Sequence, residues 1–91
     1  MGNNMAIFTK KIQSKFFEQI LSGKKKYELR LNDFDIEEGD VLILEEWAGD
    51  PRKFTGRKIE KTVNFVGRFK IGELFWSENE IKDKGLQIIS F

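Results

Sequence analysis

The sequence predicts a small α+β domain that is mostly β, with about five strands in a curled, mostly antiparallel sheet or small barrel and one early helix. Short apolar or alternating segments of strand length recur along the chain. A single stretch near the start carries apolar residues at helical spacing. The connections are short and no strand-helix-strand pattern repeats, so a parallel α/β fold is not expected.

The first predicted strand and the helix occupy residues 5–23. Residues 5–12 contain an apolar run typical of a strand. Ser14 is placed to cap the helix, and Gly23 is placed to end it in the left-handed conformation that glycine adopts freely. The apolar residues between them recur at helical spacing and predict one buried stripe: Phe16, Phe17, Ile20 and Leu21.

Residues 26–31 form the second predicted strand, because apolar and polar side chains alternate there. The side chains predicted to face the core are Tyr27, Leu29 and Leu31, and those on the opposite, polar face are Lys26, Glu28 and Arg30. Short carboxylates, an amide and a glycine then predict two tight turns between residues 32 and 40.

The second half of the chain predicts three more strands. Residues 41–44 are four consecutive apolar residues, which is typical of a strand buried on both faces. Residues 57–69 alternate along a long strand, and residues 86–91 resemble a terminal strand. Residues 73–84 are compatible with a short helix or an ordered loop. With 40% apolar residues, we expect one domain over residues 1–91 with its own core.

The composition excludes several kinds of chemistry. The chain has no cysteine and no histidine, which removes disulfides, catalytic triads that use histidine, and the commonest zinc ligand. Any catalysis has to use Lys, Glu, Asp, Thr, Ser or Tyr. No apolar run reaches the about 18 residues of a membrane helix, and the start of the chain is too polar for a signal peptide. We expect a cytoplasmic monomer without membrane association, metal or cofactor.

The net charge of +1 conceals four blocks of alternating sign. Residues 1–30 carry +5 and residues 51–70 carry +6, whereas residues 31–50 carry −8 and residues 71–91 carry −2. If the two basic blocks meet on one side of the fold, they form a positive patch suited to nucleic acid. The simpler interpretation is that the blocks are solvated faces. A third interpretation is that the acidic block binds a protein partner.

Residues 23–33 contain the leading candidate site, a glycine turn with three lysines followed by a carboxylate and an arginine. The amines of Lys24 and Lys25 suit phosphate, and the planar guanidinium of Arg30 can bind phosphate or a base edge with two hydrogen bonds. Glu28, flanked by cations, can accept hydrogen bonds from a base amino group or act as a base. The alternative is a solubilising turn followed by a ladder of exposed charges, which adds little stability.

Other stretches supply further candidate contacts. Trp47 and Trp76 can stack on a nucleobase, although a tryptophan in a small domain more often packs in the core. Thr55 and Arg57 flank a glycine, which brings a hydroxyl, a backbone amide and a guanidinium together at the end of a loop. That short pattern is not specific on its own.

The chain resembles the ASCH domains, which belong to the PUA-like superfamily of small β-barrels. Residues 23–30 match the G-x-K-x-x-E-x-R signature of that family. Residues 7–69 further resemble a compact ASCH-like subfamily of bacterial and phage proteins. The matching residues are Phe16, Phe17, Ile20, Gly23, Lys24, Lys25, Tyr27, Glu28, Arg30, Asn32, Asp33, Gly39, Asp40, Glu46, Trp47, Thr55, Gly56 and Arg57. Residues 70–84 depart from the subfamily, being longer and richer in aromatic and acidic residues.

The resemblance implies a PUA-like mixed or antiparallel barrel of five to six strands with a cleft between helix and sheet, in which RNA or a small or modified nucleotide binds. The residues expected to contact this ligand are Lys24, Lys25, Glu28, Arg30, Asn32, Trp47, Thr55 and Arg57. Some ASCH proteins are amidohydrolases that act on N4-acylated cytidine. A small hydrolase with Lys25 and Glu28 as catalytic residues is therefore the alternative, although Glu28 stands where those enzymes have a threonine. Whether the protein is an enzyme stays open at this point.

Overall fold

A computed structural model describes residues 5–91 of the chain. This part contains three strands, two α-helices and one 3-10 helix. The elements are β1 (Ile7–Gln13), α1 (Ser14–Leu21), β2 (Val41–Trp47), β3 (Phe54–Thr62), η1 (Ile71–Glu73) and α2 (Glu78–Lys84). The prediction of a small, mostly β α+β protein is confirmed. The predicted barrel of about five to six strands is not seen, because the sheet of these three strands is open.

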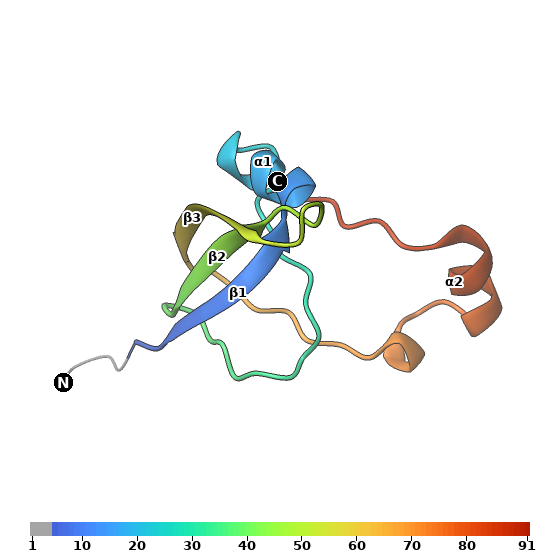
Figure 1. The fold of residues 1–91 in the computed structure, drawn as a ribbon. Coiled ribbons are helices and arrows are strands. Elements are labelled where there is room, and N and C mark those ends of the chain that lie inside the picture. Colours follow the sequence, from blue (N-terminus) through green and yellow to red (C-terminus); the bar gives the residue numbers. More distant parts are fainter. Residues whose placement is uncertain (1–4) are drawn as a thin grey trace.

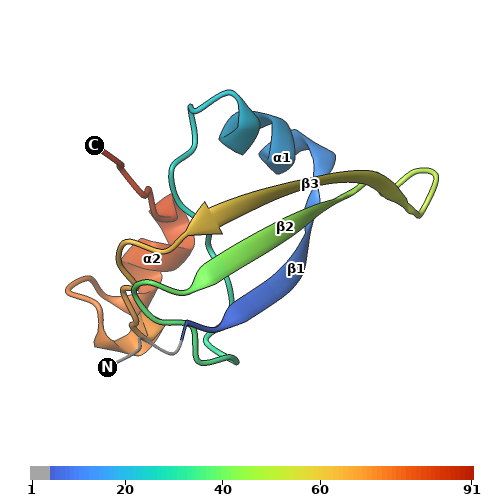
Figure 2. The same cartoon turned by 90° about the vertical axis from the view of Figure 1, so that its left-hand side faces the viewer.

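The sheet has the order β1-β2-β3 (Figure 2). β1 runs parallel to β2, with Ile12 opposite Glu46. A parallel pair needs a long crossover connection, and α1 with the loop up to residue 40 supplies it. β2 and β3 pair antiparallel across a loop that contains the cis Asp50–Pro51 peptide bond. The sheet is therefore mixed, and β1 forms one of its edges.

The core lies between α1 and one face of the sheet. Phe17 and Leu44 are each 1% exposed, and Ile12 and Ile20 complete the buried cluster. Side chains two residues apart on a strand share a face, so Ile12 and Leu44 reach the helix from neighbouring strands. This small cluster holds α1 at one end of the sheet (Figure 2).

Helix α1 differs from its prediction at the start and on one side. Gln13 occupies the N-cap position without a side-chain capping hydrogen bond, so the prediction that Ser14 caps the helix is wrong. Ser14 instead makes a small contribution to lowering the pKa of Glu46. Leu21, predicted in the buried stripe, is 55% exposed. Gly23 follows the helix with a φ of 82°, which confirms the left-handed turn predicted for it.

Two segments predicted as strands form no ladder in the described chain. Residues 26–31 pass beside β1, but the contact is a side-chain hydrogen bond from Arg30 to the Lys11 carbonyl and not a strand pairing. The predicted core face is also wrong, since Leu29 is 65% and Leu31 80% exposed. Residues 86–91 likewise have no strand partner. Alternation marks two faces, but a strand also needs a neighbour that takes its backbone hydrogen bonds.

The strand predicted over residues 57–69 is shorter and earlier in the structure. β3 spans Phe54–Thr62, and its pairing with β2 ends where Thr62 lies opposite Val41. Two further backbone hydrogen bonds join residue 63 to residues 39 and 40. The chain then leaves the sheet, so residues 64–69 have no neighbouring strand.

Elements η1 and α2 lie away from the sheet (Figure 1). Residues 73–84, for which the sequence allowed either a short helix or a loop, contain α2. This helix begins with a capping box formed by Ser77 and Glu80. The radius of gyration is 15.4 Å, against about 12 Å for a compact domain of this length. Among residues 5–91, neither the length nor the apolar content of any helix suffices for a transmembrane span.

Candidate functional site

A pocket of about 450 Å³ lies where residues 25–30 meet the edge of β1 and the start of α1. We refer to it as the Glu28 pocket. Its polar wall consists of Lys11, Gln13, Lys25, Glu28 and Arg30, and its apolar wall consists of Ile12, Phe16, Tyr27, Leu29, Leu86 and Ile88. The volume falls within the range of small-molecule sites, which are typically apolar with a few convergent polar groups.

Glu28 connects the polar groups of this pocket. One carboxylate oxygen accepts a hydrogen bond of 2.7 Å from Nε of Arg30, and the other lies 3.6 Å from Nζ of Lys25. The side chains of Glu28 and Lys25 are 14% and 12% exposed. The three signature residues of the sequence prediction therefore come together, and the two cations are held on either side of one carboxylate.

The surrounding structure fixes both cations. The turn at Gly23 brings the chain back over α1, where the backbone amide of Lys25 donates to the Gln19 carbonyl at 2.9 Å. The Lys25 ammonium lies 4.2 Å from the centre of the Phe16 ring and 5.1 Å from that of Tyr27, which are cation-π distances. Lys25 thus reaches the pocket although residues 26–31 form no strand.

Arg30 is held from the other side of the pocket. One terminal nitrogen of its guanidinium donates to the Lys11 carbonyl at 2.6 Å, while Nε binds Glu28. The same fork therefore joins the loop to an edge strand and orients the carboxylate. Planar guanidinium groups suit such fixed, multiple contacts.

Lys24, Asn32 and the tryptophans lie outside the Glu28 pocket. Lys24 is exposed, and Asn32 accepts a hydrogen bond of 3.0 Å from Arg68. Trp47 packs edge-on against Phe54, with ring centres 5.0 Å apart. The ammonium of the pocket residue Lys11 lies 4.5 Å from the Trp47 ring, so Trp47 is the pocket's neighbour.

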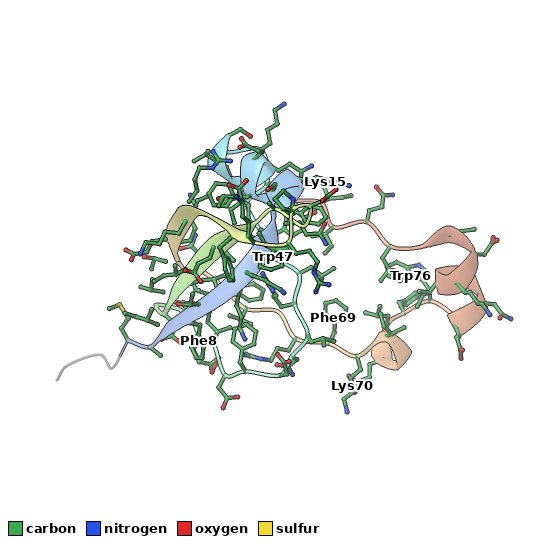
Figure 3. The ribbon with its side chains drawn as sticks, in the orientation of Figure 1. Phe8, Lys15, Trp47, Phe69, Lys70 and Trp76 are labelled. Atoms are coloured by element: carbon green, nitrogen blue, oxygen red, sulfur yellow. The ribbon has the colours of Figure 1, made fainter. Side chains whose placement is uncertain are left out.

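Trp76, the other predicted stacking residue, lies on the C-terminal segment, away from the sheet and from Trp47 (Figure 3). Its ring packs edge-on against Phe75, with ring centres 6.4 Å apart. The two tryptophans consequently do not form one stacking platform.

Thr55 and Arg57 belong to a second cluster, which we call the Glu46 clasp: Glu18, Glu46, Thr55 and Arg57. The Glu46 carboxylate is 3% exposed and accepts hydrogen bonds from Thr55 at 2.6 Å and from Arg57 at 2.8 and 2.9 Å. Arg57 also forms an ion pair with Glu18 of α1. The clasp therefore joins α1, β2 and β3, and it engages two residues that the sequence assigned to the ligand.

The clasp strongly favours the ionised form of its buried carboxylate. The hydrogen bond from Arg57, and next that from Thr55, lower the pKa of Glu46 from about 4.5 to about 2. The bond to Glu46, followed by that to Glu18, raises the pKa of Arg57. The side chains of Glu46 and Arg57 therefore both remain charged over the pH range in which most proteins are folded.

We expect the ionisation of Glu46 to make the free energy of unfolding depend on pH. A carboxyl whose pKa is depressed by folding stabilises the folded state above its unfolded pKa, and the contribution is lost as the pH falls through the folded value. The wild-type protein should therefore lose stability between pH values of about 4.5 and about 2. Urea unfolding midpoints measured across this range check the slope.

Two variants assign that slope to Glu46. Glu46→Gln should be less stable at pH 7 and should lose less of its remaining stability on acidification. Glu45→Gln is the matched control, because Glu45 is the neighbouring residue on the other face of β2. A slope in Glu46→Gln equal to that of the wild type would contradict the assignment. A residual slope is expected from Asp40.

Asp40 and Arg68 tie the loops together, although neither residue was among the predicted site residues. Asp40 is 7% exposed. Its carboxylate accepts hydrogen bonds from the backbone amides of Ala6 at 2.9 Å and Glu37 at 2.8 Å, and these bonds lower the pKa of Asp40. Arg68 donates to Asn32, Glu37 and the Ile36 carbonyl. The aspartate follows a glycine in a turn, a pattern that is too common to single it out.

The sequence prediction missed several residues of the Glu28 pocket. Lys11 and Gln13 lie on β1, Phe16 lies on α1, and Leu86 and Ile88 come from the C-terminal segment. The basic pair after the apolar start of β1 was the available signal for Lys11. The distant apolar residues carry no local signal, because only the fold brings them to the pocket.

The fold and the pocket together define a small α+β protein with a mixed sheet and a ligand-sized pocket at its free edge. No group of three or more acidic side chains in residues 5–91 is arranged to hold a metal ion. The chain belongs to the family described as "Domain of unknown function (DUF3850)", whose model matches residues 7–75. The match includes every polar residue of the Glu28 pocket.

One relative is the "Uncharacterized 12.9 kDa protein in GpA 3'region" of Escherichia phage P2. It is 45% identical over 56 residues, which are 62% of this chain and 50% of that protein. The matched part thus spans half the length of this relative.

Proposed function

We propose that the protein binds RNA or a nucleotide in the Glu28 pocket. The observation that carries the proposal is the side-by-side placement of one carboxylate and two cations within a pocket that has aromatic and aliphatic walls. A nucleotide presents the complementary groups: a phosphate for Lys25 and Arg30, a planar base for the apolar wall, and an amino group for Glu28. Lys11 lines the same wall, and its ammonium lies against the neighbouring Trp47 ring.

The resemblance to ASCH domains supports the same proposal. The PUA-like barrel that it implies has its cleft between helix and sheet, and the Glu28 pocket lies at that position between α1 and β1. Residues 26–31 and 86–91, which would add strands to such a barrel, both contribute to the pocket wall. We propose that they close around a bound nucleotide.

A hydrolase acting on N4-acylated cytidine is the second candidate. The ion pair of Lys25 and Glu28, with 3.6 Å between Nζ and Oε1, favours it, because an amine and a carboxylate side by side are groups that general acid-base catalysis uses. No serine or threonine lines the described pocket, so a hydroxyl nucleophile of that kind is missing. Binding is therefore the better-supported function. Chromatography of an N4-acylcytidine panel after incubation tests the hydrolase, which requires turnover that Lys25→Ala abolishes.

The Lys25→Ala/Arg30→Ala variant tests the binding function. We expect it to bind a short single-stranded RNA about tenfold more weakly than the wild type at low salt, because two phosphate contacts are lost. The slope of log affinity against log salt should become shallower by about one to two. Fluorescence anisotropy over a salt series measures both quantities.

A matched variant separates the pocket from general charge. Lys26→Ala/Lys82→Ala also removes two positive charges, but neither residue lines the pocket. We expect a smaller loss of affinity for this control. Equal affinities of the wild type and Lys25→Ala/Arg30→Ala, with circular dichroism showing that both are folded, would contradict the proposal.

A further inference from the structure

A second pocket, of about 330 Å³, adjoins the Glu28 pocket. Leu29 and Arg30 line both pockets, so they form the partition between them. The other residues of the second pocket are Lys10, Leu31, Asp33 and Phe34. We call it the Asp33 pocket. None of these four residues has a part in the site proposed above.

The Asp33 pocket repeats the chemistry of its neighbour. The ammonium of Lys10 lies 4.0 Å from the centre of the Phe34 ring. In the Glu28 pocket, the ammonium of Lys25 lies against the Phe16 ring in the same way. Phe8 packs against Phe34 with ring centres 5.3 Å apart, which holds that ring in place. Asp33 supplies the carboxylate. Each pocket therefore combines a positioned amine, a carboxylate and an apolar wall.

Arg30 is the group that the two pockets share. Its Nε binds Glu28, one terminal nitrogen binds the Lys11 carbonyl, and its side chain is 29% exposed. A fixed and partly accessible guanidinium between two pockets suits a phosphate that links two nucleosides. Lys25 lines the pocket on one side of Arg30, and Lys10 lines the pocket on the other.

We propose that the Asp33 pocket is a second nucleotide subsite, so that the ligand is a single-stranded RNA of at least two nucleotides and not a free nucleotide. This inference rests on the proposed function of the Glu28 pocket. Arg30 binds the phosphate that links the two nucleotides. Lys10 binds the other phosphate of the nucleotide that occupies the Asp33 pocket. Asp33 accepts hydrogen bonds from a ribose hydroxyl or a base amino group.

The test compares one nucleotide with two. Binding of cytidine monophosphate and of the 5′-phosphorylated dinucleotide pCpC is measured by calorimetry. The wild type is expected to bind the dinucleotide about tenfold more tightly, because pCpC adds a base and a second phosphate to cytidine monophosphate. Lys10→Ala should remove most of this advantage and leave the affinity for the mononucleotide unchanged. Lys10→Gln keeps most of the aliphatic stem against Phe34. It should lose the same advantage for the dinucleotide as Lys10→Ala if the charge of Lys10 is what binds the ligand.

Lys26→Ala is the matched control, since it removes a lysine that lines neither pocket. If the wild type binds both ligands equally, the second subsite is wrong and the proposed function stands. The subsite is also wrong if Lys10→Ala and Lys26→Ala keep the same advantage for the dinucleotide. If the wild type binds neither ligand, nor longer single-stranded RNA, both the subsite and the proposed function fail.

Discussion

Phe17→Ala is expected to lower the free energy of unfolding by about 3–5 kcal/mol, the cost of emptying a fully buried aromatic position. Phe17 is 1% exposed and belongs to the core cluster, which has four buried members among residues 5–91. Its ring also lies 4.7 Å from the guanidinium carbon of Arg57, so the truncation also affects the Glu46 clasp. Small domains have a total stability of about 5–15 kcal/mol, so a large fraction is lost.

Urea unfolding followed by circular dichroism measures this loss. Phe75→Ala is the matched control, because it is the same change at a side chain that is 96% exposed. We expect the control to stay within about 0.5 kcal/mol of the wild type. Similar losses in the two variants would show that the core is not where the structure places it.

The first part of the fold was predictable because its signals are local. Helical spacing identified Phe17 and Ile20, the glycine after them identified the turn, and four consecutive apolar residues identified β2. The sheet partners of residues 26–31 and 86–91 were not predictable in this way. Alternation depends on neighbouring residues, whereas pairing depends on what lies beside the strand in space.

The site was predicted in part for a related reason. Lys25, Glu28 and Arg30 lie within six positions of one another, and the turn at Gly23 is sufficient to bring them together. Alternation alone would have placed Lys26 on the polar face, and the signature pattern corrected this to Lys25. Arg57 was assigned to the ligand because a guanidinium in a loop looks the same whether its partner is a phosphate or a buried carboxylate.

The two carboxylates Glu28 and Glu46 show how structure separates these roles. Glu46 is closed off, with Thr55 and Arg57 satisfying its oxygens and α1 covering it. Glu28 has comparable cationic partners but borders a pocket. A carboxylate whose partners leave it open to a cavity can still accept a hydrogen bond from a ligand, and this makes Glu28 the group most suited to select a base.

Glu28→Gln is accordingly expected to reduce base selectivity while strengthening phosphate binding. The wild-type carboxylate only accepts hydrogen bonds, so it should favour cytidine monophosphate, with its amino group, over uridine monophosphate by about tenfold. Glutamine both donates and accepts, so the variant should bind the two nucleotides almost equally. Loss of the negative charge leaves Lys25 and Arg30 without an anionic partner, and the salt dependence of RNA binding should steepen.

Calorimetric affinities for the two nucleotides, measured at two salt concentrations, check both parts of this prediction. Glu38→Gln is the matched control, because Glu38 is exposed and lines neither pocket. The control should keep the wild-type selectivity, although it carries the same change in net charge. If Glu28→Gln keeps that selectivity as well, the carboxylate does not contact the base. Its remaining role would then be to hold Lys25 and Arg30 in place, and Glu28→Ala should weaken phosphate binding instead of strengthening it.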